Sequence, residues 1–314
     1  MKVGGVEVWW RPPLKRRALG AALFIAAAGA AGAAQYGGWG TAVNAESLTG
    51  SSEELNTAVN DGCPILNPYD NSLYMASNRP GSVPNASGTP SLDIWIAPWT
   101  GSGWGTPVNA GPTINTAADE FCPDPARGNK LFFVRRSGPG ATDIFVSKHL
   151  PNSGFQTPQR LPTGDGAINS AAEEWSPSWF EADGHEYLYF SSTREGRQRI
   201  YYSVDYGPAQ LASGGVNTSD PTVQDARPNV RHDGLEIVFD SNRYGTAGAQ
   251  DIWTAHRSSV NSSWGPAENL GSGINSPVND TRASLSWDGT VLMFGSGRSG
   301  GGDIYTAVRN KNGQ

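Results

Sequence analysis

The sequence predicts an all-β fold, a five-bladed β-propeller of four-stranded blades, and three observations support this prediction. First, a short polar segment with an acidic residue at one fixed place occurs five times. Second, each copy is followed by the same series of strand-like segments over about 50 residues, which is typical of propeller blades. Third, the last unit lacks a fourth strand-like segment, and an additional segment of this type stands before the first unit. The five acidic residues are Asp61, Glu120, Glu174, Asp225 and Asp280.

The units begin at these acids, which are spaced 59, 54, 51 and 55 residues apart. An apolar segment follows each acid and leads into a Ser/Arg-Gly turn, such as SNRPG from Ser77. A segment that opens with Asp-Ile-aromatic comes next, such as DIWIA from Asp93, although the third unit departs from this pattern and has Arg199 before its Ile-aromatic pair. A fourth segment opens with an aromatic residue, such as GWGTPVN from Gly103. Aromatic and β-branched runs bounded by turn residues are typical of strands.

The two ends of the repeat region predict how the ring closes. The last unit stops after DIYTAVRN, from Asp303, and therefore lacks a fourth strand. GGWGTAVN, from Gly37, is a fourth strand with no unit before it. We expect this N-terminal strand to complete the last blade, because closure removes exposed sheet edges. The alternative, that Trp39 begins an unrelated strand, leaves the missing strand unexplained.

Residues 1–34 have the layout of a signal peptide. A basic region that ends at Arg17 precedes ALGAALFIAAAGAAGAA, an apolar run built mostly from small residues. We expect a secreted, periplasmic or cell-envelope protein, with residues 35–314 forming a single propeller domain. A membrane anchor is the alternative, although a run of about 17 residues is short for a span of roughly 20.

The charge of the chain limits its partners. Removal of residues 1–34 takes away five basic residues and one acidic residue, so the net charge falls from −6 to −10. A surface this acidic argues against nucleic acid and anionic membranes as partners. After residue 40 the sequence has no further segment that could span a bilayer.

The repeat resembles the PD40, or WD40-like, propeller repeat of TolB and of exported proteins associated with OmpA. The resemblance is carried by Asp/Glu-x-x-Pro, by Ser-x-Arg-x-Gly and by Asp-Ile-aromatic, and it covers residues 37–308. The fifth copy departs from it, with Ala283 in the place of the proline. The resemblance implies that the strand after each acid is the innermost one, so that the five carboxylates ring one mouth of the channel. It also implies binding, sensing or scaffolding roles.

Three interpretations of the carboxylate ring remain open. In the first, each acid is structural: it caps backbone N–H groups or pairs with an arginine of the Ser-x-Arg-x-Gly turns. In the second, the five acids hold a hard cation such as calcium, which prefers oxygen ligands. In the third, two of them catalyse glycoside hydrolysis, which needs two carboxylates with separated pKa values. The arginines considered are Arg79, Arg136, Arg194, Arg243 and Arg298.

Departures from the repeat indicate where a ligand could bind. Aromatic residues follow the acid in units two and three, which also carry adjacent acid pairs, and arginines stand two places after the acid in units four and five. Arginine can hold a carboxylate or phosphate by paired hydrogen bonds, and aromatic rings can stack on a sugar or a side chain. Alternatively, the arginines pair with the acids and the aromatic rings pack between blades. The candidate ligand-binding residues are Asp119, Glu120, Phe121, Glu173, Glu174, Trp175, Arg227 and Arg282.

The two cysteines of the chain, Cys63 and Cys122, stand at equivalent places in adjacent units. An even number of cysteines in an exported protein suggests a disulfide. Inner strands lie close together near a propeller axis, so a bridge between the two is plausible. The four histidines show no metal spacing, and two cysteines alone do not complete a zinc site.

The sequence therefore favours a non-catalytic binding or scaffold protein that recognises a protein, peptide or glycan at the channel mouth. The alternative is a glycan-active hydrolase that uses carboxylates at the axial mouth. There is no Gly-x-Ser-x-Gly, no phosphate-binding loop and no His-Glu-x-x-His motif. No cofactor is firmly expected, with calcium the one candidate.

Overall fold

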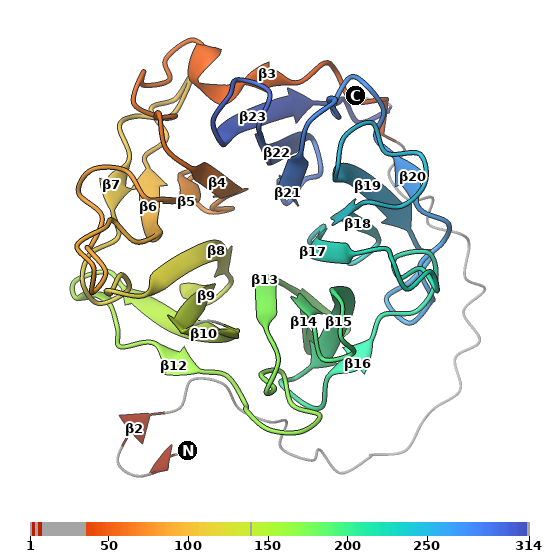
Figure 1. Ribbon diagram of the computed structural model, residues 1–314, viewed down its shortest axis with the longest axis horizontal. Coiled ribbons are helices and arrows are strands. Elements are labelled where there is room, and N and C mark those ends of the chain that lie inside the picture. The colour runs from red at the N-terminus through yellow and green to blue at the C-terminus, as the bar shows by residue number, and fades with distance from the viewer. Residues whose placement is uncertain (1, 4–5, 8–35, 139, 313–314) are drawn as a thin grey trace.

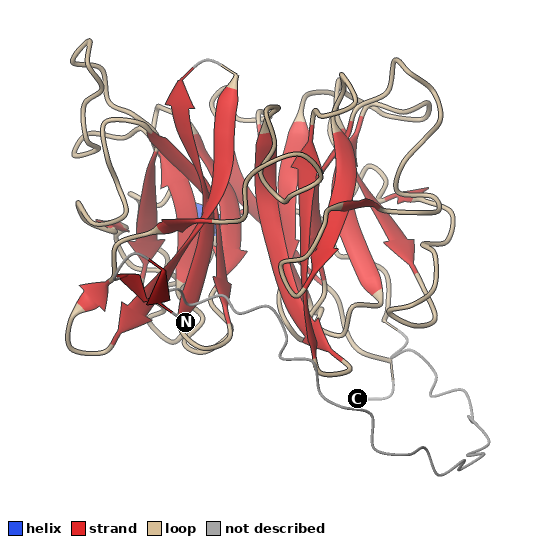
Figure 2. Cartoon of the chain, turned by 90° about the horizontal axis from the view of Figure 1, so that it is seen from below, coloured by secondary structure: helices blue, strands red, loops and turns tan. Residues whose placement is uncertain are grey.

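The computed structural model describes residues 2–3, 6–7, 36–138 and 140–312. Five antiparallel sheets stand around a central axis like the blades of a propeller (Figure 1). Seen from the side, the strands run between two faces that carry the loops (Figure 2). The predicted all-β, five-bladed fold is confirmed.

In blades 1 to 4 the strands follow one another in sequence order from the innermost strand outward, and in blade 5 the N-terminal β3 takes the outermost place. Blade 1 contains β4 (Asp61–Leu66), β5 (Leu73–Ser77), β6 (Asp93–Ala97) and β7 (Val108–Asn109). Blade 2 contains β8 (Asp119–Ala126), β9 (Lys130–Gly138), β10 (Ala141–Leu150), β11 (Gly154–Phe155) and β12 (Gln159–Arg160). Blade 3 contains β13 (Glu174–Ala182), β14 (His185–Ser192), β15 (Arg199–Val204) and β16 (Gln210–Leu211).

Blade 4 contains β17 (Asp225–Val230), β18 (Glu236–Ser241), β19 (Asp251–His256) and β20 (Glu268–Asn269). Blade 5 contains β21 (Asp280–Leu285), β22 (Val291–Ser296), β23 (Asp303–Val308) and β3 (Val43–Asn44). A short 3-10 helix, η1 (Ala45–Ser47), follows β3. β1 (Lys2–Val3) and β2 (Val6–Glu7) pair only with each other.

The outermost strands are short, and apart from β11, which contains Phe155, they begin after the aromatic residue that opens each fourth segment. In blades 1 to 4 a proline lies just before the paired residues, and a residue without an N–H cannot donate to the sheet. In blade 1, for example, pairing with β6 starts at Val108, directly after Pro107. The aromatic residue itself packs inward: Trp104 of blade 1 and Trp264 of blade 4 are both buried.

The ring closes as the sequence predicts. β3 pairs antiparallel with β23, with Asn44 opposite Tyr305 and Val43 opposite Thr306, so the N-terminal strand completes the last blade. The backbone N–H of Gly37 donates to the carbonyl of Asn310 at 2.9 Å and extends this contact toward the C-terminus. Blade 5 is therefore a complete four-stranded sheet.

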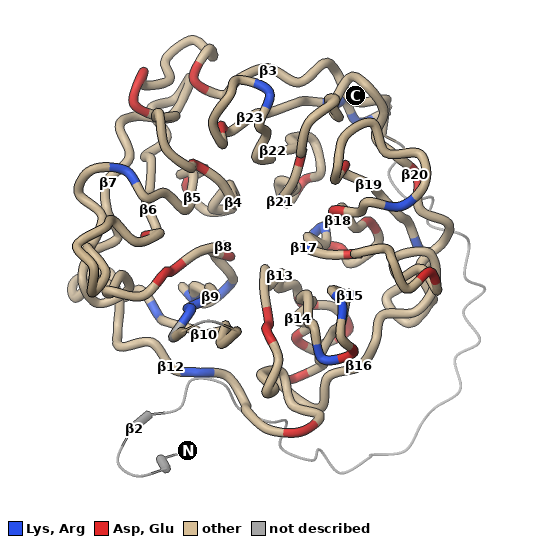
Figure 3. The backbone as a smooth tube through the Cα atoms, viewed as in Figure 1, with Lys and Arg blue, Asp and Glu red and all other residues tan. Residues whose placement is uncertain are grey.

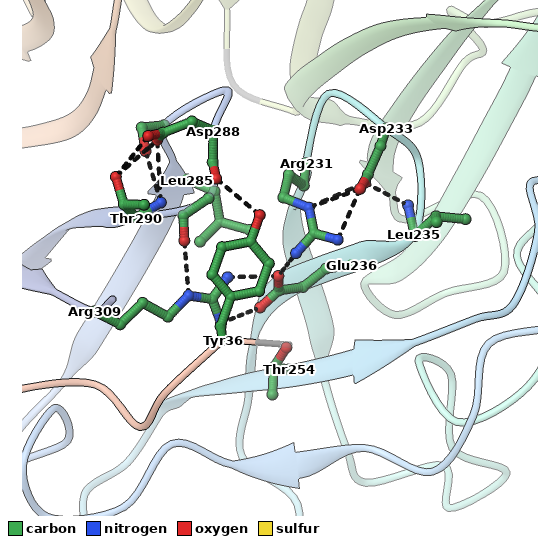
Figure 4. Close-up of polar contacts among 12 residues, drawn as sticks. Tyr36, Arg231, Asp233, Leu235, Glu236, Thr254, Leu285, Asp288, Thr290 and Arg309 are labelled. Carbon is green, nitrogen blue, oxygen red and sulfur yellow. Dashed lines mark hydrogen bonds and ion pairs between the residues drawn. The ribbon is translucent and has the colours of Figure 1, made fainter. Parts of the chain in front are cut away.

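A buried ion cluster reinforces the closure (Figure 4). The carboxylate of Glu236 in blade 4 accepts hydrogen bonds from Arg231 and from Arg309, the latter at 2.8 and 2.6 Å. The guanidinium group of Arg309 also lies 4.0 Å from the ring centre of Tyr36, whose hydroxyl donates to the carbonyl of Asp288. The cluster thus joins the N-terminal segment to blades 4 and 5.

The hydrophobic core lies between the blades. One cluster combines Met75 of blade 1 with Met293 of blade 5, and another combines Phe180 of blade 3 with Phe239 of blade 4. A single four-stranded sheet cannot bury both of its faces, so each blade covers its neighbour. The radial packing fixes the inner strands around the axis and so positions the channel.

Among the described residues, no helix is long and apolar enough to cross a membrane. The predicted signal peptide, residues 1–34, lies outside the described residues apart from the four residues of β1 and β2.

Candidate functional site at the channel mouth

The five repeated acids lie at the start of the innermost strands β4, β8, β13, β17 and β21, which surround the axis (Figure 3). Asp61 is typical: its carboxylate accepts the backbone N–H of Thr57 at 2.6 Å, the Thr57 hydroxyl at 2.7 Å and Nη2 of Arg79 at 2.6 Å. All five side chains are at most 2% exposed. The other pairs are Glu120 with Arg135, Glu174 with Arg194, Asp225 with Arg243 and Asp280 with Arg298.

One predicted partner is wrong. In blade 2, strand pairing sets Arg135 opposite Glu120, at the place that Ser77 occupies opposite Asp61 in blade 1. Arg135 therefore reaches the carboxylate directly, with Nε 2.6 Å from it. Arg136, which was expected there, faces the other side of the strand pair and binds Asp119 at 3.0 Å.

This arrangement agrees with the first interpretation, in which each acid pairs with an arginine and accepts backbone N–H groups. Within its own blade, each carboxylate forms an ion pair with an arginine and accepts hydrogen bonds from the loop that precedes the strand. In the part of the chain that the structure describes, no group of three His, Cys, Asp or Glu residues could hold a metal ion. Glycoside hydrolysis also needs two carboxyl groups that face a substrate, whereas these five are buried and paired.

The residue two places after each acid adopts a left-handed backbone conformation. Its φ angle lies between 47° and 58° in all five blades, where the innermost strand forms a β-bulge. Such bulges turn a side chain away from the sheet pattern and are frequent beside functional sites. Here they direct five side chains to the channel wall: Cys63, Cys122, Ser176, Arg227 and Arg282.

On one side of the channel the bulges form the predicted disulfide. Cys63 and Cys122 are bonded, with 4.7 Å between their α carbons, which lies within the usual range for such bridges. The bond links the innermost strands of blades 1 and 2. The wall is therefore apolar and covalently closed at this junction.

On the opposite side the wall is cationic. Arg227 donates to Asp240 at 3.1 Å and to Gln250 at 3.0 Å, and its guanidinium group lies over the ring of Trp175. Asp240 also accepts the backbone N–H of Arg282 at 2.9 Å. Burial raises the pKa of Asp240 to about 6, although Arg227 and these hydrogen bonds act against the rise. Asp240 is thus ionised near neutral pH and neutralises one arginine.

The guanidinium group of Arg282 has no hydrogen-bond or ion-pair partner among the described residues, and the side chain is exposed to the channel. Desolvation lowers its pKa to about 10, and repulsion from Arg227 and Arg136 contributes. It therefore remains charged at neutral pH. Arg136 and Arg227 are paired with Asp119 and Asp240, whereas Arg282 has no paired carboxylate among the described residues.

Two cavities meet at Arg282. The channel interior has a volume of about 30 Å³ and is lined by the bulge residues and the prolines that follow them, which leaves room for about two water molecules. A larger cavity of about 180 Å³ opens at the mouth, beside blade 1. A ligand can therefore occupy the mouth, whereas the interior is too narrow for a sugar ring. The mouth cavity is lined by Asn60, Asp61, Gly62, Cys63, Ala76, Leu92, Phe121, Arg282 and Gly302.

The remaining predicted ligand-binding residues lie around this mouth and differ in their burial and in their interaction partners. Phe121 is buried beneath the guanidinium group of Arg136, and Trp175 is half-buried with its indole N–H donated to Thr142. Glu120 and Glu174 belong to the structural ring, and burial raises the pKa of Glu120 despite its hydrogen bonds. Glu173 is half-buried beside Glu174.

Sequence reasoning missed Asp240 and Gln250. Asp240 stands opposite Ala226 in the β17–β18 pair, at a place where the other four blades have small or apolar residues. A carboxylate at this position departs from the repeat in the same way as Arg227, and this departure is the sequence signal for Asp240. The equivalent residues are Ala76, Val134, Ser191 and Gly295.

The fold and the mouth define a five-bladed β-propeller with a cationic opening on the acid-ring face. No protein-family model and no curated protein matches the chain. Among solved structures, the catalytic domain of the Coprinopsis cinerea GH62 α-L-arabinofuranosidase has a TM-score of 0.55 at 10% identity. The match covers 87% of this chain and 96% of that chain.

Two further structures show the range of similar propellers. The GH43_1 enzyme from Xanthomonas citri has a TM-score of 0.55 at 14% identity and covers 82% of this chain and 89% of its own. A putative TolB from Agrobacterium tumefaciens has a TM-score of 0.44 at 17% identity, over 77% of this chain and 72% of that chain. At these identities the similarity concerns the fold alone.

Proposed function

We propose that the chain is an exported, non-catalytic binding or scaffold propeller of the PD40 type, which recognises an anionic group of a protein, peptide or glycan at its channel mouth. The unpaired guanidinium group of Arg282 carries this proposal. Arg227 and Arg136 repel the guanidinium group of Arg282, and a ligand anion would offset that repulsion.

The surroundings of Arg282 support recognition of an anion. The whole chain is acidic, with a net charge of −6, so an arginine without an ion pair at one mouth is an exception to its overall charge. Arginine offers a planar set of donors that matches a carboxylate or phosphate, with two parallel hydrogen bonds. Trp175 and Arg136 border the same mouth and offer further contacts for a larger partner.

Binding is preferred to hydrolysis because of the state of the carboxylates. A retaining or inverting glycosidase needs one carboxyl group as acid and a second as nucleophile or base. The mouth cavity has a single carboxylate in its wall, that of Asp61, and Arg79 and Thr57 already occupy it.

The test is isothermal titration calorimetry of the purified protein against acidic and neutral peptides and glycans. Arg282→Gln removes the charge at the mouth, and Arg127→Gln removes one from an exposed pair with Glu181 elsewhere, as the matched control. An acidic ligand should bind the wild-type protein and the control, and lose about tenfold or more in affinity with Arg282→Gln. Equal affinity for all three proteins would refute the proposal, and release of sugar from a glycan would favour the hydrolase.

A further inference from the structure

The mouth cavity is asymmetric, and one glycine creates it. The residue after the ring acid is Phe121 in blade 2 and Trp175 in blade 3, but Gly62 in blade 1. A β-carbon at Gly62 would lie 3.6 Å from Nη1 of Arg282, so the guanidinium group lies next to this gap. The absent side chain leaves the cavity open beside blade 1.

The walls of this cavity combine an apolar part with a polar part of similar size. Leu92, Ala76 and the ring of Phe121 line it, and the bonded Cys63 lies toward the channel interior. The guanidinium group of Arg282 is the one uncompensated charge among the described residues that line it. A cavity of this kind offers one ion pair and an adjoining apolar surface.

We infer that the mouth cavity binds a carboxylate that carries a small aliphatic group, with the carboxylate on Arg282 and the aliphatic group in the gap above Gly62. The inference rests on the proposed function and specifies its ligand class. The chemistry has two sources, the C-terminal residue of a peptide and a free short-chain carboxylic acid.

Charge favours a carboxylate over a phosphate. A carboxylate carries one negative charge, which a single free arginine neutralises, whereas a phosphate monoester carries about −1.5 to −2 and three acceptor oxygens. Arg227 and Arg136 are already paired with Asp240 and Asp119, so they supply no further free donor set. A phosphate monoester on Arg282 would therefore keep part of its charge uncompensated, and those of its oxygens that face Leu92, Ala76 and Phe121 would have no partner.

Size favours a small group. The cavity of about 180 Å³ ends at the narrow interior of about 30 Å³, whose wall of prolines and the disulfide stops deeper insertion. Burial of an aliphatic side chain yields about 25 cal/mol for each Å² of apolar surface removed from water. The aliphatic group therefore adds affinity that acetate lacks, and it selects against larger rings.

The test titrates isovalerate, isovaleramide, acetate and inorganic phosphate into the purified protein by calorimetry. A short peptide that ends in leucine is added with a free and with an amidated C-terminus. Gly62→Phe fills the gap while it keeps Arg282, and blade 2 carries phenylalanine at this position, so the backbone accepts it. Gly273→Phe, at a glycine with open space around it and no positive φ, is the matched control.

Isovalerate should bind more tightly than acetate and phosphate, and isovaleramide should not bind. Arg282→Gln should weaken isovalerate by about tenfold or more, and Gly62→Phe should abolish binding while Gly273→Phe leaves it unchanged. If the peptide with a free C-terminus binds more tightly than isovalerate, the natural ligand is a peptide C-terminus. If the peptide and isovalerate bind with equal affinity, the natural ligand is the free acid. If Gly62→Phe unfolds, Gly62→Leu replaces it, and folding is verified by circular dichroism.

Two results separate this inference from the proposed function. If Arg282→Gln weakens an acidic partner but Gly62→Phe does not, the mouth binds anions and the aliphatic-carboxylate inference is overturned. If phosphate binds as tightly as isovalerate, the inference is also overturned. If Arg282→Gln changes the affinity of no anion, the proposed function fails together with it.

Discussion

At the residue scale, the ring acids stabilise the blades because each is buried together with a matching positive charge. Removing one member of a buried pair leaves the other charge without compensation, which commonly costs about 3–5 kcal/mol. The cost depends on how well water can reach the remaining charge. The exposure of the arginines differs between blades, so the five pairs are not equivalent.

Asp61→Ala should lower the free energy of unfolding by about 3–5 kcal/mol, because the side chain of Arg79 is only 6% exposed. Asp280→Ala should cost less, since the side chain of Arg298 is 22% exposed and water can solvate it. Urea denaturation measures both. The double variant Asp61→Ala, Arg79→Met should recover part of the loss, because it removes the unpaired charge as well. A double variant that is no more stable than Asp61→Ala would contradict this explanation.

The carboxylate of Asp124, which lies outside the ring of five acids, predicts that the free energy of unfolding depends on pH. Asp124 lies buried in β8 and accepts the backbone N–H of Trp179 at 2.6 Å. Burial raises its pKa from 3.8 to about 8, against the effect of that hydrogen bond. Because the folded pKa lies above the unfolded one, its stabilising contribution is complete below about pH 3.8. It is lost as the pH rises through about 8.

Asp124→Asn should therefore flatten the dependence of stability on pH. In the wild-type protein this group lowers the free energy of unfolding by at most about 1.4 kcal/mol per pH unit between the two pKa values. The variant keeps an oxygen acceptor for Trp179 but cannot ionise, so it should exceed the wild type in stability at pH 8 and lose the advantage at pH 4. Urea titrations at a series of pH values measure this, and identical slopes for both proteins would disprove the assignment.

At the element scale, hydrogen bonds join each innermost strand to the next around the channel. The residue four places after the ring acid accepts a backbone N–H from the neighbouring blade: Ser178 from Val230 at 2.9 Å and Asn229 from Leu285 at 2.8 Å. Asp124 does the same for blade 3, and Ser284 donates to the carbonyl of Pro64 at 2.6 Å between blades 5 and 1.

The junction between blades 1 and 2 lacks this bond for a chemical reason. Ile65 stands where an acceptor is needed, and Pro125 stands where the N–H is needed. Neither residue can form the bond. The disulfide between Cys63 and Cys122 spans the same junction and replaces the missing hydrogen bond with a covalent one.

Reducing the disulfide, or replacing both cysteines by serine, should lower the free energy of unfolding by about 4 kcal/mol, as chain entropy predicts for a separation of 59 residues. Hydrogen exchange should accelerate first in β4 and β8. Ser178→Ala is the control: it removes one hydrogen bond between blades 3 and 4, at a cost of about 1 kcal/mol, and should accelerate exchange there instead. If reduction accelerates hydrogen exchange equally at all five junctions between blades, the disulfide has no specific role at the junction of blades 1 and 2.

The repeat pattern was sufficient to predict the blades and the closing strand, because strand periodicity and turn residues depend on local sequence. It did not identify Arg135 as the partner of Glu120, because RRS in blade 2 offers two arginines and only strand register selects between them. The bulges were also unpredictable, since the left-handed residue is not a glycine in any blade. Candidate ligand residues were located near the mouth, but their pairing depends on contacts between blades.

At the scale of the whole molecule, ring closure depends on a segment of nine residues. Residues 36–44 supply β3 to the edge of β23, and Tyr36 lies between the guanidinium groups of Arg231 and Arg309, with ring-centre distances of 4.8 and 4.0 Å. These contacts connect the first and last parts of the propeller. Without the segment, β23 becomes an edge strand, and exposed edges pair readily with other chains.

Deletion of residues 36–44 should lower the free energy of unfolding by about 3 kcal/mol or more, the usual cost of losing one packed aromatic side chain. The exposed edge of β23 should also make the protein self-associate, because unpaired N–H and C=O groups can bind a second copy. Size-exclusion chromatography with light scattering measures association, and urea denaturation measures stability. A synthetic peptide of residues 36–44 should restore both properties, whereas the same peptide with Tyr36 and Trp39 replaced by alanine should bind weakly. A deletion variant that remains monomeric and as stable as the full chain would show that the blades close without this strand.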